Sequence, residues 1–118
     1  MVETKVVESS VVPGLEVYPE TPGRVVKREL VGKREAAPNF AMRLFEVAAS
    51  GATEHHRHPW EHEVFIVEGE GQLLTDDGPM PFKAGAAVYV APNAMHQFQN
   101  TGAATLKFIC MIPNSGDK

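Results

Sequence analysis

Long hydrophobic runs are missing from this sequence. Its 118 residues are 43% hydrophobic, yet no apolar stretch approaches the roughly 20 residues that a membrane-spanning helix needs. The first residues also lack the basic start, apolar middle and small-residue cleavage site of a secretory signal. We therefore expect no transmembrane segment and a cytoplasmic location.

Cysteine and clustered positive charge are scarce as well. Cys110 is the single cysteine, so no internal disulfide can form, which agrees with a reducing compartment. The formal charge is −4 and the Lys and Arg residues form no cluster, which argues against binding to nucleic acid. The length suits one domain with a real core. We expect small molecules as partners, and neither nucleic acid nor a membrane.

No stretch has a convincing helical pattern. Short apolar runs alternate instead with turn signals every several residues, which predicts an all-β antiparallel sandwich or barrel. Residues 1–23 are broken by Pro13-Gly14, Pro19 and Pro22-Gly23, and we expect an N-terminal arm with short edge strands there. Residues 24–118 are expected to form a single barrel domain.

The strands of this barrel can be placed by their residue pattern. Asp76-Asp77-Gly78-Pro79 lies between two apolar runs and predicts a hairpin. Runs rich in β-branched and aromatic residues, bounded by turn residues, predict the others. The expected strands cover residues 24–31, 40–48, 63–68, 72–75, 80–82, 87–90, 95–99 and 104–112.

Histidines are concentrated in one stretch. His56, His58 and His62 lie within seven residues, and alternate residues of an extended chain point to the same side about 6.6 Å apart. Pro59 breaks the strand between them, which lets His62 return from another direction. A fourth histidine, His96, begins a strand far downstream, and a barrel could bring it opposite the first three. The pattern predicts one divalent metal ion held by imidazoles.

These residues carry a resemblance to the cupin superfamily, and specifically to small single-domain cupins with a four-histidine metal site. The first cupin motif corresponds here to a glycine, three histidines and a second glycine, and the second motif to a glycine, a proline, a histidine and an asparagine. The corresponding residues are Gly51, His56, His58, His62 and Gly69, then Gly85, Pro92, His96 and Asn100. The resemblance implies a double-stranded β-helix, the jelly-roll barrel of cupins.

The sequence departs from the common cupin pattern at three places. Gly51 lies one position closer to the histidine pair than the motif glycine usually does. His62 stands where most cupins have a glutamate ligand, but the stretch is typical of the four-histidine subgroup, which makes His62 the third ligand. Asn93 replaces the glycine of the second turn, and asparagine tolerates a positive φ. His55 should face away from the metal, because it directly precedes His56.

The ligand set predicts the charge of the site but not the metal. Four neutral imidazoles would leave a divalent ion with its whole positive charge, which should attract anions, and six-fold coordination would leave two open positions. Imidazole suits zinc, nickel and copper as well as iron. The resemblance to small cupins favours manganese or iron.

Strand alternation gives candidate pocket walls around the metal. If His96 points inward, Phe98 does too, and Phe108 and Cys110 share one face of the last strand, as Arg43 and Phe45 share one face of theirs. Trp60 is either a lid of the pocket or an anchor of its loop. Cys110 is either a small core residue or an oxidisable thiol, and Arg43 is either solvated or a holder of substrate carboxylate.

Three functions remain open on this evidence. The leading one is a metal-dependent oxidoreductase of dioxygenase or oxidase type acting on a small anionic or aromatic molecule, because no acid–base pair is visible. A non-catalytic ligand-binding or sensing cupin is the rival. A sugar-acid isomerase or lyase would need Glu46 or Glu54 to point at the metal. The apolar outer face of the last strand also favours a homodimer, which is common in this family.

Overall fold

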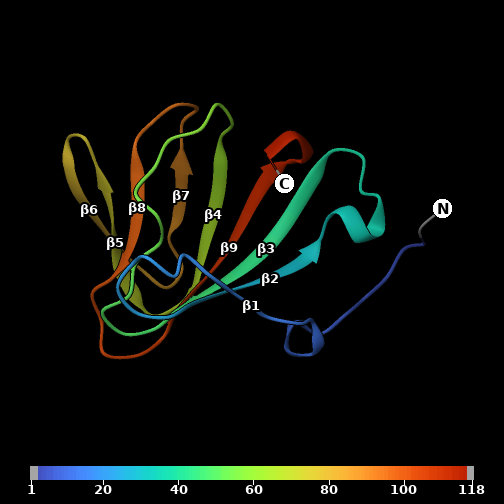
Figure 1. Cartoon of the computed structure of the whole chain (residues 1–118), viewed down its shortest axis with the longest axis horizontal. Coiled ribbons are helices and arrows are strands. Elements are labelled where there is room, and N and C mark those ends of the chain that lie inside the picture. The colour runs from blue at the N-terminus through green and yellow to red at the C-terminus, as the bar shows by residue number, and fades with distance from the viewer. Residues whose placement is uncertain (1–2, 117–118) are drawn as a thin grey trace.

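The regular secondary structure of the protein is almost entirely β-strand, as a computed structural model that describes residues 3–116 shows (Figure 1). A short strand in the N-terminal arm precedes eight further strands. Their bounds are β1 Leu15–Val17, β2 Val25–Val31, β3 Phe40–Val47, β4 His62–Glu68, β5 Glu70–Thr75, β6 Gly78–Lys83, β7 Ala87–Val90, β8 His96–Asn100 and β9 Leu106–Pro113.

The strands form two antiparallel sheets that face each other (Figure 1). One sheet has six strands in the order β1-β2-β3-β9-β4-β7, and the other has three in the order β6-β5-β8. Among the described residues no ladder closes the two sheets into a continuous barrel. The expected all-β jelly-roll barrel is confirmed, and every strand predicted between residues 24 and 112 is present within about two residues.

The last strand begins later than the apolar pattern predicted, at Leu106 instead of residue 104. The cause is Asn100, whose side-chain amide donates hydrogen bonds of 2.9 Å to the carbonyls of Val47 and Ala104. Its Oδ1 also accepts from the backbone N–H of Gly102 at 2.8 Å. This buried asparagine holds residues 101–104 in a turn, so they cannot join β9.

The core lies between the sheets. Burial alternates along β9, where Leu106, Phe108, Cys110 and Ile112 are buried and the residues between them are not fully covered. The ring of Phe108 stacks on those of Phe45 and Phe98, with centroid distances of 5.2 and 4.6 Å. Aromatic rings from both sheets therefore fill the space directly below the histidines.

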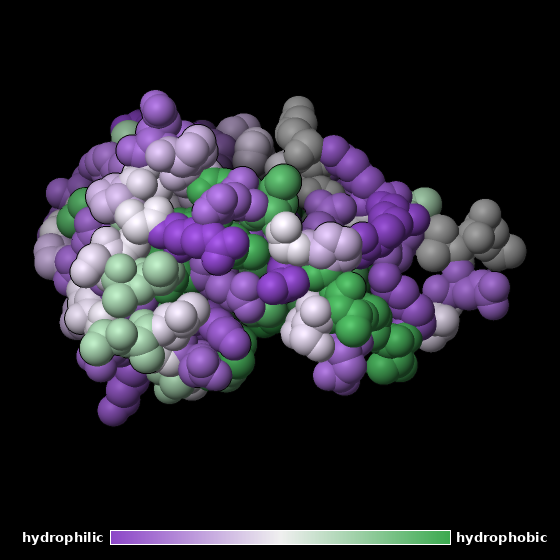
Figure 2. Space-filling view, turned by 60° about the horizontal axis from the view of Figure 1, so that its bottom comes forward, coloured by the Kyte–Doolittle hydropathy of each residue, from purple (hydrophilic) through white to green (hydrophobic). Residues whose placement is uncertain are grey.

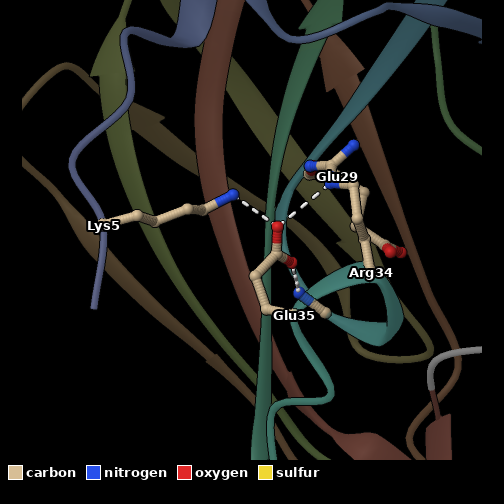
Figure 3. A network of polar contacts seen from close by, with 5 residues as sticks. Lys5, Glu29, Arg34 and Glu35 are labelled. Carbon is tan, nitrogen blue, oxygen red and sulfur yellow. Dashed lines mark hydrogen bonds and ion pairs between the residues drawn. The ribbon is translucent and has the colours of Figure 1, made fainter. Parts of the chain in front are cut away.

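The N-terminal arm lies along the edge of the six-stranded sheet. β1 pairs with β2, and Arg28 Nη1 donates a 2.6 Å hydrogen bond to the carbonyl of the buried Val12. Figure 3 shows a second attachment, in which Lys5 and Arg34 both contact the carboxylate of Glu35. The division into an arm of residues 1–23 and a barrel of residues 24–118 stays a prediction.

The arm also carries apolar side chains on its surface. Val6, Val11 and Leu15 are 98%, 70% and 63% exposed. Figure 2 shows a cluster of hydrophobic side chains on the side of the molecule where Figure 1 places the arm. Elsewhere on that face hydrophobic and hydrophilic groups are interspersed.

Helical structure is limited to single 3-10 turns within the described residues. They span Ser9–Val11, Lys33–Glu35 and Asn114–Gly116. None of the helices in residues 3–116 is long and apolar enough to cross a membrane.

Candidate metal centre

The first histidine is placed by an irregular segment beside β8. Residues 51–56 run antiparallel to that strand, with Thr53 donating to the carbonyl of Phe98 and Asn100 donating to that of Gly51, each at 2.9 Å. Further along, His56 and His96 exchange both backbone hydrogen bonds, at 3.1 and 3.0 Å. This pairing brings two histidines that are forty residues apart in sequence to directly opposite positions.

The second histidine lies on the loop that follows. The carbonyl of His58 accepts a 2.7 Å hydrogen bond from the backbone N–H of Asn93. Asn93 has a φ of 65°, so the prediction that asparagine preserves this turn with a positive φ is confirmed. The ring of Trp60 lies parallel to that of His58 at 4.2 Å, and Gly116 packs against the indole. His58 is thus held by a turn on one side and by an indole on the other.

The third histidine comes from a regular strand. His62 begins β4, pairs with Val90 of β7, and is only 7% exposed. Glu63, the next residue, is exposed on the opposite face of the strand, and His55 is exposed as predicted.

The ligand atoms of three histidines lie close enough to hold one ion. Those of His56, His58 and His96 are all within 4.8 Å of one another. The fourth ring adjoins this group, because His62 Nε2 lies 2.7 Å from His58 Nε2 and the ring centroids of His62 and His96 are 5.1 Å apart. Two nitrogens bound at right angles, about 2.1 Å from a common ion, would be about 3.0 Å apart. The donor spacing therefore fits a divalent ion, and His62 as a fourth ligand stays a prediction.

Each ring is turned by a hydrogen bond at its other nitrogen. Nδ1 of His58 donates to the carbonyl oxygen of Trp60 at 2.8 Å. Nδ1 of His96 donates to the carbonyl oxygen of Ala94 at 2.9 Å. The Glu54 carboxylate lies 2.8 Å from His56 Nδ1. Because these oxygens only accept, the proton of each neutral ring sits on Nδ1 and leaves a lone pair on Nε2. Such outer contacts orient metal-binding histidines.

His62 differs from the other three, because its Nδ1 meets sulfur. The Sγ of Cys110 lies 2.7 Å from that nitrogen and 3.5 Å from Nη2 of Arg43. A thiol can donate or accept, whereas a carbonyl only accepts. Since His58 Nε2 carries a lone pair, the 2.7 Å contact between the two Nε2 atoms is a hydrogen bond only when His62 holds its proton there. Cys110 then donates to Nδ1, and it would accept from Nδ1 once a metal takes the lone pair of Nε2.

Burial favours the uncharged form of three of these rings, those of His58, His62 and His96, by lowering their pKa values. Burial, as the largest cause, and the neighbouring imidazoles together lower the pKa of His62 to about 2 and that of His96 to about 4. The pKa of His58 is lowered by burial too, against the hydrogen bond to Trp60, which raises it. Burial raises the pKa of the Cys110 thiol more than the positive charge of Arg43 lowers it. The centre therefore offers neutral nitrogen donors.

A small cavity lies between the rings and the aromatic core. Its volume is about 20 Å³, room for about one water molecule. Aromatic rings, imidazoles and two small polar side chains, those of Thr53 and Cys110, line it. The lining residues are Tyr18, Phe45, Thr53, His56, His62, His96, Phe98, Phe108 and Cys110. No carboxylate is among them.

Four of the six predicted pocket residues lie on this cavity: Phe45, Phe98, Phe108 and Cys110. Arg43 is buried behind Cys110, with its guanidinium 5.4 Å from the Phe45 ring and no hydrogen-bond partner for its Nε. Trp60 lies outside the cavity, against His58.

Sequence reasoning missed two of the lining residues. Tyr18 comes from the N-terminal arm, which carried no functional signal, and Thr53 comes from the irregular segment. Glu54 points to the outer nitrogen of His56 and not into the cavity. Only the position of Glu54, two residues before a ligand, hinted at its role.

Comparisons with known proteins agree with this arrangement. The chain matches the cupin domain described as Cupin_2 over residues 43–112. It is 32% identical over 94 residues to an oxalate-binding protein of Thermotoga maritima, covering 76% of each chain. The chain belongs to the cupin family.

Solved structures extend the similarity to the whole fold. The polyketide cyclase RemF of Streptomyces resistomycificus is 27% identical, with a TM-score of 0.87 over 95% of this chain and 80% of that one. A cupin 2 domain-containing protein of Halorhodospira halophila is 36% identical, with a TM-score of 0.73 over 76% of this chain and 64% of that one. Cupins commonly bind a divalent metal, and the histidine cluster fits that property.

Proposed function

We propose that this cupin is a metal-dependent oxidoreductase of dioxygenase or oxidase type that acts on a small anionic or aromatic molecule. The carrying observation is the lining of the cavity, which has inward-facing imidazoles, aromatic rings and no carboxylate. A divalent ion there, manganese or iron, would supply the redox chemistry and the positive charge that binds an anion. His56, His58, His62 and His96 would hold it.

The chain's own residues shape what can enter. The cavity of about 20 Å³ is far below the roughly 300 Å³ of an ordinary ligand pocket, so only a few atoms of a ligand fit between the rings. Phe45, Phe98 and Phe108 form its floor and keep water out of the core. We infer that the reacting end of the molecule, such as a carboxylate, reaches the histidines while the rest stays at the mouth.

A non-catalytic ligand-binding cupin is the second candidate. The oxalate-binding relative at 32% identity favours it, because a small dicarboxylate would suit both the charge and the size of the site. The isomerase or lyase alternative is less well supported, because both glutamates that could have served it make other contacts. Glu46 contacts Arg28 at 3.3 Å, and Glu54 is bound to the outer nitrogen of His56.

Oxygen consumption and ligand-induced stabilisation separate the two candidates. Protein loaded with manganese or iron is assayed for oxygen uptake with oxalate, small diketones and phenols, and its melting temperature is measured with each compound. Turnover above that of free metal supports the oxidoreductase. Stabilisation without turnover supports the binding protein. The absence of both turnover and stabilisation would contradict both candidates.

We further propose that two copies associate through the outer face of the six-stranded sheet. Phe40, Phe65 and Tyr89 are 63%, 52% and 60% exposed on β3, β4 and β7 of that sheet. Antiparallel sheets normally leave a polar outer face where water covers it. Light scattering should give a mass close to twice 12.9 kDa, and a monomer at micromolar concentration would contradict the proposal.

A further inference from the structure

Tyr18 belongs to the N-terminal arm, yet its ring lines the cavity beside the histidines. It stacks parallel to Phe45, with centroids 6.4 Å apart, and meets the ring of His56 edge-on at 6.5 Å. The arm therefore contributes a phenol to a centre that is otherwise built from the barrel.

The backbone at Tyr18 is held in an unusual conformation. Its φ is 55°, in the left-handed region that bulky side chains rarely adopt. The carbonyl of Tyr18 accepts two hydrogen bonds from Thr21, one from the backbone N–H at 3.1 Å and one from Oγ1 at 2.8 Å. β1 ends at Val17, so this turn redirects the next side chain toward the cavity. Strained residues of this kind cluster at functional sites.

The chemistry of the other lining residues leaves a role for the phenol. The three phenylalanine rings have no hydrogen-bond donor, and the outer nitrogens of His56, His62 and His96 are used in orienting contacts. The Cys110 sulfur is engaged by His62 and Arg43. Thr53 Oγ1 accepts a hydrogen bond from the backbone of Phe98 at 2.9 Å. Tyr18 brings the one aromatic hydroxyl to this described lining.

We propose that Tyr18 contacts the ligand, donating a hydrogen bond from its hydroxyl to the anionic group that binds at the histidine centre. The inference rests on the proposed metal function. It adds that the arm completes the ligand site, and that the ligand class is one with an acceptor oxygen or nitrogen next to the metal-bound atom, such as a carboxylate or azide.

Tyr18→Phe tests the hydroxyl while keeping the ring, and Tyr89→Phe is the matched control, because Tyr89 is exposed on β7 and does not line this cavity. Protein loaded with cobalt is titrated with oxalate and with azide, and the visible absorption bands of the metal report binding. We expect Tyr18→Phe to bind cobalt as tightly as wild type but to bind the anions about tenfold more weakly, the typical loss of one hydrogen bond to a charged group. Tyr89→Phe should match wild type.

A second variant tests the turn. Thr21→Val keeps Tyr18 as a tyrosine but removes the side-chain hydrogen bond to its carbonyl, which helps to hold the turn. It should weaken anion binding by about threefold, in proportion to a neutral hydrogen bond, without changing cobalt affinity.

The outcomes separate this inference from the function beneath it. Wild-type anion affinity in Tyr18→Phe, with cobalt bound normally, would overturn the role of Tyr18 and leave the proposed function standing. Failure of wild-type protein to bind cobalt would overturn the metal function and the role of Tyr18 together. Cobalt binding without anion binding in wild type would overturn the anionic ligand class and with it the contact from Tyr18.

Discussion

The four neighbouring histidines form two walls of different construction around the candidate metal centre. The strand wall consists of His62 at the start of β4 and His96 at the start of β8, which are 7% and 2% exposed. The loop wall consists of His56 and His58, which precede β4 on an irregular segment and remain partly exposed. One wall belongs to the strand ladders of the two sheets, and the other to an irregular segment that is joined to β8 at His56 by an isolated bridge.

The two walls differ in what holds their histidines and therefore in the role that we infer for each. Ladder pairing and burial hold the strand wall in one position and keep its rings neutral, with pKa values of about 2 and 4. Backbone hydrogen bonds with His96 and Asn93 place the loop wall, and the Glu54 carboxylate and the carbonyl and ring of Trp60 orient its imidazoles. We infer that the strand wall fixes where an ion binds and that the loop wall controls how it is reached.

The largest expected effect comes from removing a ring from the strand wall. His96→Ala should weaken zinc binding by more than about a hundredfold, beyond the range found for outer contacts, because its buried position offers no substitute ligand. His58→Ala should cost less, since water can reach that position. Calorimetric titration measures both, with the exposed His55→Ala as the control. Equal losses for His58→Ala and His96→Ala would remove the distinction between the walls.

Acid should destabilise the metal-free protein through the strand wall. Unfolded chains take up protons at His62 and His96 as pH falls below about 6.5, while the folded protein takes them up only near the lower folded pKa values. The unfolded state then binds more protons, so stability falls from about pH 6.5 toward pH 4. The slope is up to ~1.4 kcal/mol per pH unit for each proton.

Urea unfolding at pH 7, 5.5 and 4.5 measures this slope. The variant His62→Phe keeps an aromatic ring but cannot be protonated, so its stability should depend less on pH than that of wild type. An unchanged slope in this variant would show that His62 does not couple folding to pH.

A smaller effect is expected from the sulfur behind the strand wall. Cys110→Val keeps a small apolar side chain at this position but removes the partner of His62 Nδ1, and zinc affinity should fall by about tenfold, as for other outer contacts. Cys110→Ser should stay close to wild type, because a hydroxyl also donates and accepts. Competition with a chelator gives the affinities. A valine variant as tight as wild type would mean that packing alone orients His62.

Most of the barrel could be predicted because its signals are local. The Asp-Asp hairpin, the apolar alternation of β9 and the positive φ of Asn93 follow from residue preferences that act over a few positions. That His96 could lie opposite the other histidines was inferred from the expected barrel, but its direct pairing with His56 was not predicted, since it depends on the closure of the fold.

The features that sequence reasoning missed all depend on contacts between distant segments. Tyr18 reaches the cavity because a turn at the end of β1 and docking against β2 place it there, and neither leaves a pattern around residue 18. Cys110 meets His62 because β9 lies between β3 and β4. A single cysteine in an apolar strand reads as core, and only the three-dimensional neighbourhood reveals its partner.

The stacking of Trp60 on His58 has a practical consequence. Trp60 is the single tryptophan in the chain, and its ring lies 4.2 Å from that of a predicted ligand. Its fluorescence therefore originates beside the mouth of the centre and nowhere else in the protein. Loading with a paramagnetic ion should quench that emission, so the tryptophan fluorescence of the unlabelled protein reports how much of the site is occupied by metal.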